Sequence, residues 1–164
     1  MDPRAIFGIN ILVSFVSAIV IAKLYVWPWL RLKNGHDSLI WLVAPHMFLR
    51  FIGLSFLVPG VVSPRLPAAF AVPAGYGDFV AGVLAIIATL ALSRRASWAT
   101  LIVWLFNIWG AADLLFAFYQ GARTQLDPGA LGAAFFIVTA IVPPLLVTHA
   151  LIFRVLAFKH SRTT

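Results

Sequence analysis

The chain has 164 residues, of which 62% are hydrophobic and only 10% are charged. Soluble domains are about 45–50% apolar and about 25% charged, so this composition excludes a soluble globular protein and a disordered chain. The net charge of +7 comes without any basic run longer than two residues. We therefore expect no nucleic-acid partner, and we expect the basic residues to gather in loops on one side of a membrane.

Five stretches of the chain are long and apolar enough to cross a bilayer as helices, which takes about 20 mostly apolar residues. In chain order they cover residues 5–24, 39–58, 73–92, 98–119 and 130–153. We therefore predict an all-α integral membrane bundle of about five transmembrane helices, forming one domain over residues 1–164. The lipid bilayer is its expected partner.

Turn and cap signals separate the first three stretches. Asn34-Gly35 is a turn dipeptide, and Asp37 or Ser38 is expected to cap the second helix. Pro73 suits the first turn of the third helix, where its missing N–H group would have no partner anyway. Residues 68–72 are then expected to belong to a connector before the helix.

The later boundaries rest on proline and glycine. Asp127-Pro128-Gly129 predicts a turn before the fifth stretch, and Pro143-Pro144 lies inside that stretch. Two consecutive prolines remove backbone donors within a helix, so we expect a kink there.

The orientation follows from the basic residues. With five spans, one side of the membrane holds Arg4, Arg65 and Arg123, and the other holds Lys23, Arg31, Lys33, Arg94, Arg95, Arg154, Lys159 and Arg162. The side richer in Lys and Arg is cytoplasmic by the positive-inside rule. We therefore predict that the N-terminus lies outside and the C-terminus inside.

Small and polar residues at helical spacing predict which faces point into the bundle, because transmembrane helices pack through such residues. The third stretch carries a face of this kind made of Gly75, Asp78, Gly82, Ala85 and Thr89, and the first carries Asn10, Ser14 and Ser17.

Three charged residues fall inside the spans, where a charge is unfavourable by about 2.5–3.5 kcal/mol even on insertion scales. They are Arg50, Asp78 and Asp113. At 1.5 Å per residue, Asp78 lies about 8 Å below Pro73 and Asp113 about 9 Å from Tyr119, so the two carboxylates match in depth. Arg50 can reach either one, and we expect Asn107 nearby.

One arginine against two carboxylates leaves a negative charge over, so one carboxyl must hold a proton, a cation or a basic ligand. Arg50, Asp78, Asp113 and Asn107 are thus the candidate ligand- or proton-binding residues. The alternative is an ion network that only fixes the register of the helices.

His46 and His149 also match in depth, but lie about 10 Å from the Asp pair on the same helical-rise estimate. They are candidate ligands of haem b or of a metal ion, and buried imidazoles with ordinary hydrogen-bond partners are the alternative. The chain has no cysteine, which excludes thiolate chemistry. We identify no catalytic residue and do not favour an enzyme.

The stretch LPAAFAVPAGYGD from Leu66 to Asp78 resembles a pattern found in uncharacterised small integral membrane proteins of bacteria. The stretches NIWGAAD from Asn107 and HALIFR from His149 are similar to the same pattern. The resemblance implies a multi-pass protein of a bacterial cytoplasmic (inner) membrane. It implies no activity and no cofactor.

These observations favour a small membrane protein whose buried polar site binds a small molecule, an ion or a proton. One alternative is an accessory or assembly subunit of a larger membrane complex. The candidate protein partners are further copies of this chain, in a homo-oligomer, or the subunits of a larger membrane complex. A second alternative is a redox protein that binds haem through His46 and His149.

Overall fold

The computed structural model describes residues 2–160, and all regular structure in that range is helical. Arg162, one of the residues used for the orientation, lies outside it. In chain order the elements are α1 (Pro3–Ile21), η1 (Ala22–Val26), α2 (Trp27–Arg31), α3 (Gly35–Leu49), η2 (Phe51–Leu57), α4 (Ala68–Ser93), α5 (Ala99–Arg123), η3 (Pro128–Ala134), η4 (Ile137–Ile141) and α6 (Val142–His160).

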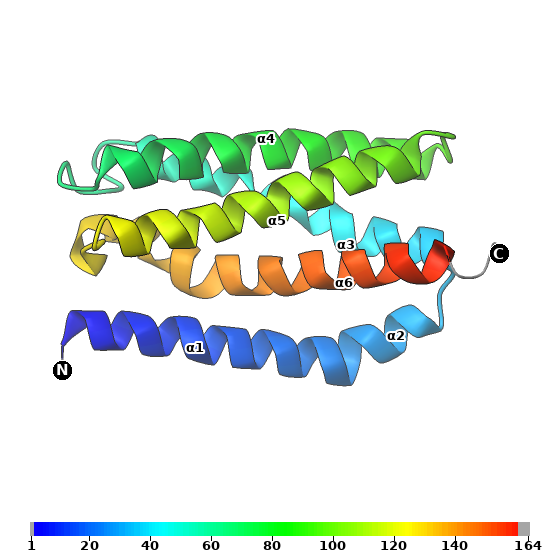
Figure 1. Cartoon of the computed structure of the whole chain (residues 1–164), viewed down its shortest axis with the longest axis horizontal. Helices are drawn as coiled ribbons and strands as arrows, with labels where there is room; N and C mark the ends of the chain where they lie inside the picture. The colour runs from blue at the N-terminus through cyan, green and yellow to red at the C-terminus, as the bar shows by residue number, and fades with distance from the viewer. Residues whose placement is uncertain (1, 161–164) are drawn as a thin grey trace.

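Five helical stretches of the described chain are long and apolar enough to cross a membrane, as expected from the sequence. They are Pro3–Arg31, Gly35–Leu57, Ala68–Ser93, Ala99–Arg123 and Ile137–Ala157. Each predicted stretch corresponds to one of them. The helices lie side by side along one axis, and the start of α1 and the end of α6 are at opposite ends of the bundle (Figure 1).

The helices are not equally enclosed. α4 packs against α3, η2 and α5, whereas α1 packs against α6 and η4 at the edge of the bundle (Figure 1). The prediction that Asn10, Ser14 and Ser17 form a buried face of the first helix is wrong. Asn10 is exposed and its Nδ2 donates to the carbonyl oxygen of Ile6 within the same helix, at 3.0 Å. α1 instead contacts the bundle through Phe7 and Phe15.

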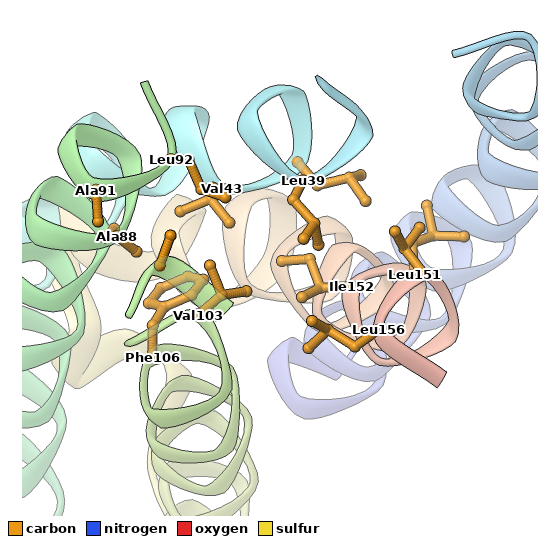
Figure 2. Close-up of a cluster of buried hydrophobic side chains, with 14 of the residues drawn as sticks. Leu39, Val43, Ala88, Ala91, Leu92, Val103, Phe106, Leu151, Ile152 and Leu156 are labelled. Carbon is orange, nitrogen blue, oxygen red and sulfur yellow. The ribbon is translucent and has the colours of Figure 1, made fainter. Parts of the chain in front are cut away.

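The apolar core is divided into two clusters, one toward each end of the bundle. The first is built around Leu39, Val43, Phe106 and Ile152 at the end where α3 begins (Figure 2). The second occupies the end that holds the N-terminus, with Phe56, Phe70, Leu114, Leu131 and Val138 among its members. Some helices contribute residues to both clusters. On each of these helices, the polar residues described below lie between the residues of the first cluster and those of the second.

Asn34, and not Asp37 or Ser38, caps the second span. Its Oδ1 accepts a hydrogen bond from the backbone N–H of Asp37 at 2.8 Å, and its Nδ2 donates to the Asp37 carboxylate at 2.9 Å. The predicted cap lies three or four residues too late because Gly35 begins the helix instead of completing a turn.

α4 begins at Ala68, so the expectation of a connector over residues 68–72 is wrong. Pro73 lies inside the helix and cannot donate to the carbonyl oxygen of Ala69. The side chain of Gln120 on α5 donates to that oxygen instead, at 2.9 Å. A partner from another helix thus compensates for the missing hydrogen bond and allows the helix to continue through the proline.

The fifth span widens into a π-type turn, η4, directly before Pro143 and Pro144, and continues from it as α6. A proline cannot donate to the carbonyl oxygen four residues before it, which for these two residues is that of Thr139 and of Ala140 in η4. The helix is therefore irregular where the two prolines remove hydrogen bonds.

Candidate functional site

Arg50 lies where the second span changes from α3 to the tighter helix η2. Its side chain is completely buried. Among the described residues, it is one of the largest side chains that are fully buried. The residue caps α3, and its backbone N–H donates to the carbonyl oxygen of His46 at 3.1 Å. A long cationic side chain is thereby directed into the polar layer between the two apolar clusters.

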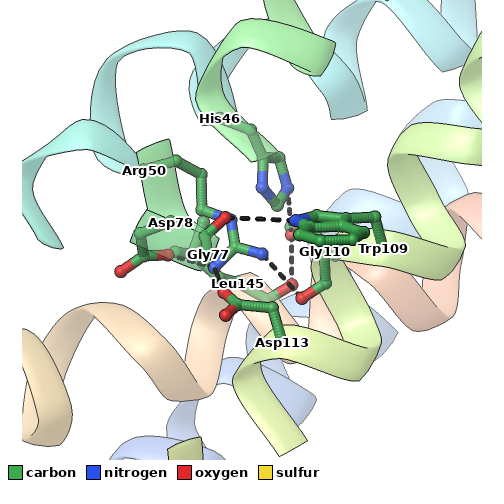
Figure 3. Close-up of polar contacts among 9 residues, drawn as sticks. His46, Arg50, Gly77, Asp78, Trp109, Gly110, Asp113 and Leu145 are labelled. Atoms are coloured by element: carbon green, nitrogen blue, oxygen red, sulfur yellow. Dashed lines mark hydrogen bonds and ion pairs between the residues drawn. The ribbon is translucent and has the colours of Figure 1, made fainter. Parts of the chain in front are cut away.

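The structure brings both predicted carboxylates to Arg50. Nη1 of Arg50 forms an ion pair with Asp78 of α4 and a second one with Asp113 of α5, at 3.3 Å (Figure 3). Asp78 lies ten residues after the start of α4, and Asp113 lies ten residues before the end of α5. At 1.5 Å per residue both are about 15 Å from those helix ends. They are thus deeper than expected, because α4 starts earlier and α5 ends later than predicted.

In each carboxylate, only one of the two oxygens accepts a hydrogen bond from the guanidinium. One oxygen of Asp78 (Oδ1) and one of Asp113 (Oδ2) accept from Arg50 Nη1. Within the described residues, no hydrogen bond reaches Asp78 Oδ2 or Asp113 Oδ1. The three side chains together carry a formal charge of −1 when both carboxyl groups are ionised. The group can therefore accept one more positive charge.

Two glycines make room for the carboxylates. A Cβ atom at Gly53 of η2 would overlap the carboxylate of Asp78, and one at Gly77 of α4 would overlap that of Asp113. The carbonyl oxygen of Gly77 also accepts a hydrogen bond from the Trp109 indole at 3.2 Å (Figure 3). The close approach of these helices therefore depends on residues without side chains.

A third glycine receives the other terminal nitrogen of Arg50. Nη2 donates to the carbonyl oxygen of Gly110 on α5 at 2.6 Å. A Cβ atom at Gly110 would lie 2.8 Å from that nitrogen and 2.7 Å from His149 Nε2. Arg50 and His149 thus flank the same glycine, and the histidines are not a separate group 10 Å from the charged residues, as the helical rise had suggested.

His46 and His149 lie against each other, with ring centroids 4.6 Å apart. Phe106 contacts both rings, with centroids at 5.1 and 5.2 Å. His46 Nε2 lies 2.9 Å from the hydroxyl of Thr148, which itself donates to the carbonyl oxygen of Leu145. With the hydroxyl proton directed to Leu145, His46 Nε2 is the donor to the hydroxyl oxygen.

Asn107 forms hydrogen bonds with His149 and with neither carboxylate. Its Oδ1 lies 2.7 Å from His149 Nδ1, and its Nδ2 donates to the carbonyl oxygen of His149 at 3.2 Å. Asn107 thus joins the charged group through His149, which lies with Arg50 against Gly110. The two hydrogen bonds between Asn107 and His149 also fix the orientation of the His149 ring.

The histidine pair does not fit a haem in this arrangement. An iron ligated by two imidazoles stands between the two rings with the porphyrin plane, whereas here the rings touch and Phe106 closes one side. Nor do the described residues contain a group of three or more His, Asp or Glu side chains placed to hold a metal ion. Within the part of the chain that the structure describes, the buried atoms His46 Nδ1, His149 Nε2 and Arg50 Nε have no hydrogen-bond partner.

A cavity of about 260 Å³ adjoins the carboxylates. Asp78 and Asp113 lie in its wall, and almost all the other lining residues are apolar. Aromatic rings come from four elements, namely Phe7 of α1, Phe56 of η2, Phe70 of α4 and Phe118 of α5. These residues place the cavity in the half of the bundle that holds the N-terminus (Figure 1).

Comparison with known proteins assigns the chain to a family by its sequence. The family described as a domain of unknown function, DUF8737, matches residues 6–157. The chain belongs to the DUF8737 family. No curated protein and no solved structure matches it. The matched range contains every residue of the charged group, the histidine pair and the cavity.

The aromatic cavity of this DUF8737 chain was not predicted from the sequence, although a signal was present. Each carboxylate continues a stripe of every fourth residue toward the cavity. The stripes are Phe70, Ala74 and Asp78 on α4, and Asp113, Ala117 and Gly121 on α5. Small residues beside a buried acid leave space, and the position of an aromatic residue across that space depends on the packing of other helices.

Proposed function

We propose that this chain is a multi-pass protein of a bacterial cytoplasmic membrane, crossing it five times with the N-terminus outside. Five sufficiently long apolar stretches support this, since an odd number puts the two termini on opposite sides. Basic residues with aromatic partners at the expected inner end support it further. Lys33 stands 4.3 Å from the Trp29 ring and Arg154 stands 3.8 Å from the Trp27 ring. Tryptophan and basic side chains are typical of a membrane interface.

We propose further that the protein binds a small molecule, an ion or a proton at Arg50, Asp78 and Asp113. The observation that carries this proposal is the uneven charge of a buried group. A fully buried guanidinium meets two carboxylates whose side chains are 7% and 8% exposed. Burying unbalanced charge is far less favourable than burying a matched pair. A bound cation or proton restores the balance.

The surroundings of the group support binding from one side. The cavity reaches the carboxylates through the half of the bundle near the N-terminus. Toward the other end, the cluster around Leu39, Val43, Phe106 and Ile152 is closely packed, with each of these side chains fully buried (Figure 2). This arrangement favours a binding site over a continuous pathway across the protein.

Two hypotheses compete with the proposed binding function. In one the charged group is a purely structural ion network, and in the other the protein is an accessory subunit. The accessory-subunit hypothesis predicts that the small-residue faces meet another chain. On α4, however, Gly75, Gly82 and Ala85 are buried within this chain. A purely structural ion network does not explain why a cavity lies beside the unsatisfied carboxylate oxygens.

Native mass spectrometry of protein purified gently from its own membrane tests the proposed binding. We expect a small adduct on the wild type that is lost in Asp113→Asn and retained in Asp37→Asn, a control at a carboxylate whose side chain is 47% exposed. Circular dichroism and gel filtration show whether each variant is folded. The proposal fails if folded Asp113→Asn carries the same adducts, or if the only added mass is another protein chain.

A further inference from the structure

We infer that the cavity binds an organic monocation with an apolar, ring-sized body, such as a protonated amine or a quaternary ammonium ion. The cationic group would stand at Asp78 and Asp113, and the body among the four phenylalanines of the cavity. This inference rests on the proposed function and names the class of its ligand.

The charge of the group selects a cation. Both terminal nitrogens of Arg50 are engaged, one by the two carboxylates and the other by the Gly110 carbonyl oxygen. Within the described chain, one N–H of Nη2 and the N–H of Nε remain without a partner, but the formal charge of −1 on the group repels an anion. Asp78 and Asp113 each retain an oxygen without a hydrogen bond, in side chains that are more than nine-tenths buried. These oxygens can accept one further positive charge or hydrogen-bond donor.

The cavity selects an organic ligand over a bare ion. A proton or a sodium ion would balance the charge but would leave about 260 Å³ of largely apolar space unfilled. A cavity of about 150 Å³ with apolar walls is large enough to hold benzene. The space next to the carboxylates therefore fits one ring together with an ammonium group.

The aromatic lining of the cavity also favours a positively charged ligand. The faces of phenylalanine rings attract cations, most strongly where water is excluded. Phe56 and Phe70 already lie together, with their ring centroids 5.3 Å apart and their planes at 80°. Aromatic rings near an acidic group are the usual means of holding quaternary ammonium ions, which cannot donate a hydrogen bond.

Isothermal titration calorimetry on the whole protein in nanodiscs tests the inference, with empty nanodiscs as the reference. The probes are benzyltrimethylammonium, its uncharged isostere neopentylbenzene, and sodium chloride. We expect saturable binding of benzyltrimethylammonium only. Asp113→Asn should weaken it at least tenfold, and Asp37→Asn should leave it unchanged.

A second pair of variants keeps the test independent of the carboxylates. Ala117 lines the cavity, whereas Ala112 is exposed on the same helix. We expect Ala117→Leu to fill part of the cavity and weaken binding at least tenfold, and Ala112→Leu to have no effect. Equal binding by these two variants would overturn the inference even if every carboxylate variant failed to fold.

The remaining outcomes separate the inference from the proposed function. Equal binding of the charged and uncharged probes overturns the inference, because the carboxylates would then select nothing. Binding of sodium, but not of benzyltrimethylammonium, in a manner that requires Asp113 overturns the inference and leaves the proposed function in place. If neither cation binds, Asp113→Asn loses no natural adduct and infrared spectroscopy shows no protonated carboxyl group, both fail.

Discussion

Arg50 donates through Nη2 to the backbone carbonyl oxygen of Gly110, 2.6 Å away on α5. The contact fixes the buried cation against a helix, where the absence of a Cβ atom leaves room for it. The same glycine lies beside the His149 ring. One position of α5 therefore controls the spacing of three helices around the charged group.

Gly110→Ala should consequently destabilise the fold. The new methyl carbon would lie 2.5 Å from His149 Cε1 and 2.8 Å from Arg50 Nη2, and overpacking of this kind costs about 1–3 kcal/mol. The control is Gly8→Ala, since nothing lies within 4 Å of a Cβ atom there. Thermal unfolding in detergent, followed by circular dichroism, should show a lower melting temperature for Gly110→Ala alone. Equal melting temperatures for the two variants would show that the close approach is not required.

Arg50→Met should be more damaging than removal of the whole charged group. The single substitution leaves two buried carboxylates without a cation, and loss of one partner from a buried ion pair costs about 3–5 kcal/mol. The triple variant Arg50→Met, Asp78→Asn and Asp113→Asn removes all three charges and should recover much of that loss. Unfolding by titration with sodium dodecyl sulfate measures both free energies. Equal losses in the two proteins would contradict a charge-based interpretation.

The purified protein should have no Soret absorption band. The reason is the direct contact of His46 and His149, whose ring centroids are 4.6 Å apart and leave no slot for a porphyrin. Visible absorption spectra after expression with added haem precursor provide the measurement. A Soret band that vanishes in both His46→Ala and His149→Ala would show that the rings separate to bind haem.

Much of this arrangement could be predicted from the sequence, because a charge within an apolar helix needs a partner at similar depth. That requirement alone indicated the grouping of Arg50 with Asp78 and Asp113. The five apolar stretches also located the helices, although not their ends. The helix ends depend on tertiary contacts such as the hydrogen bond from Gln120 to Ala69, which compensates for Pro73.

The contents of the site were harder to predict, since they depend on how each helix is rotated. Asn107 and Asp113 are both polar residues of α5, yet Asn107 turns to His149 and Asp113 turns to Arg50. Likewise, the polar side chain of Asn10 suggested a buried face on α1. This helix lies at the edge of the bundle, and Asn10 hydrogen-bonds to the backbone of the same helix instead.

The predicted orientation can be measured because the chain contains no cysteine. Ser97→Cys lies in the turn before α5 and Gln125→Cys lies just beyond its other end, and both positions are exposed. A membrane-impermeant maleimide should label Gln125→Cys in intact cells, but should label Ser97→Cys only after lysis. The reverse pattern would place the N-terminus, and the cavity end, on the cytoplasmic side.

The central claim is that Arg50, Asp78 and Asp113 hold one negative charge too many and therefore bind a proton or a cation. Infrared spectroscopy of the carboxyl C=O stretch tests this most directly, in protein exchanged into a buffer free of sodium and amines. We predict one protonated carboxyl band that is lost in the Asp78→Asn, Asp113→Asn double variant and disappears when benzyltrimethylammonium is added. If the wild type has no such band and carries no bound cation, both carboxylates are balanced by Arg50 alone, and the group is a structural ion network.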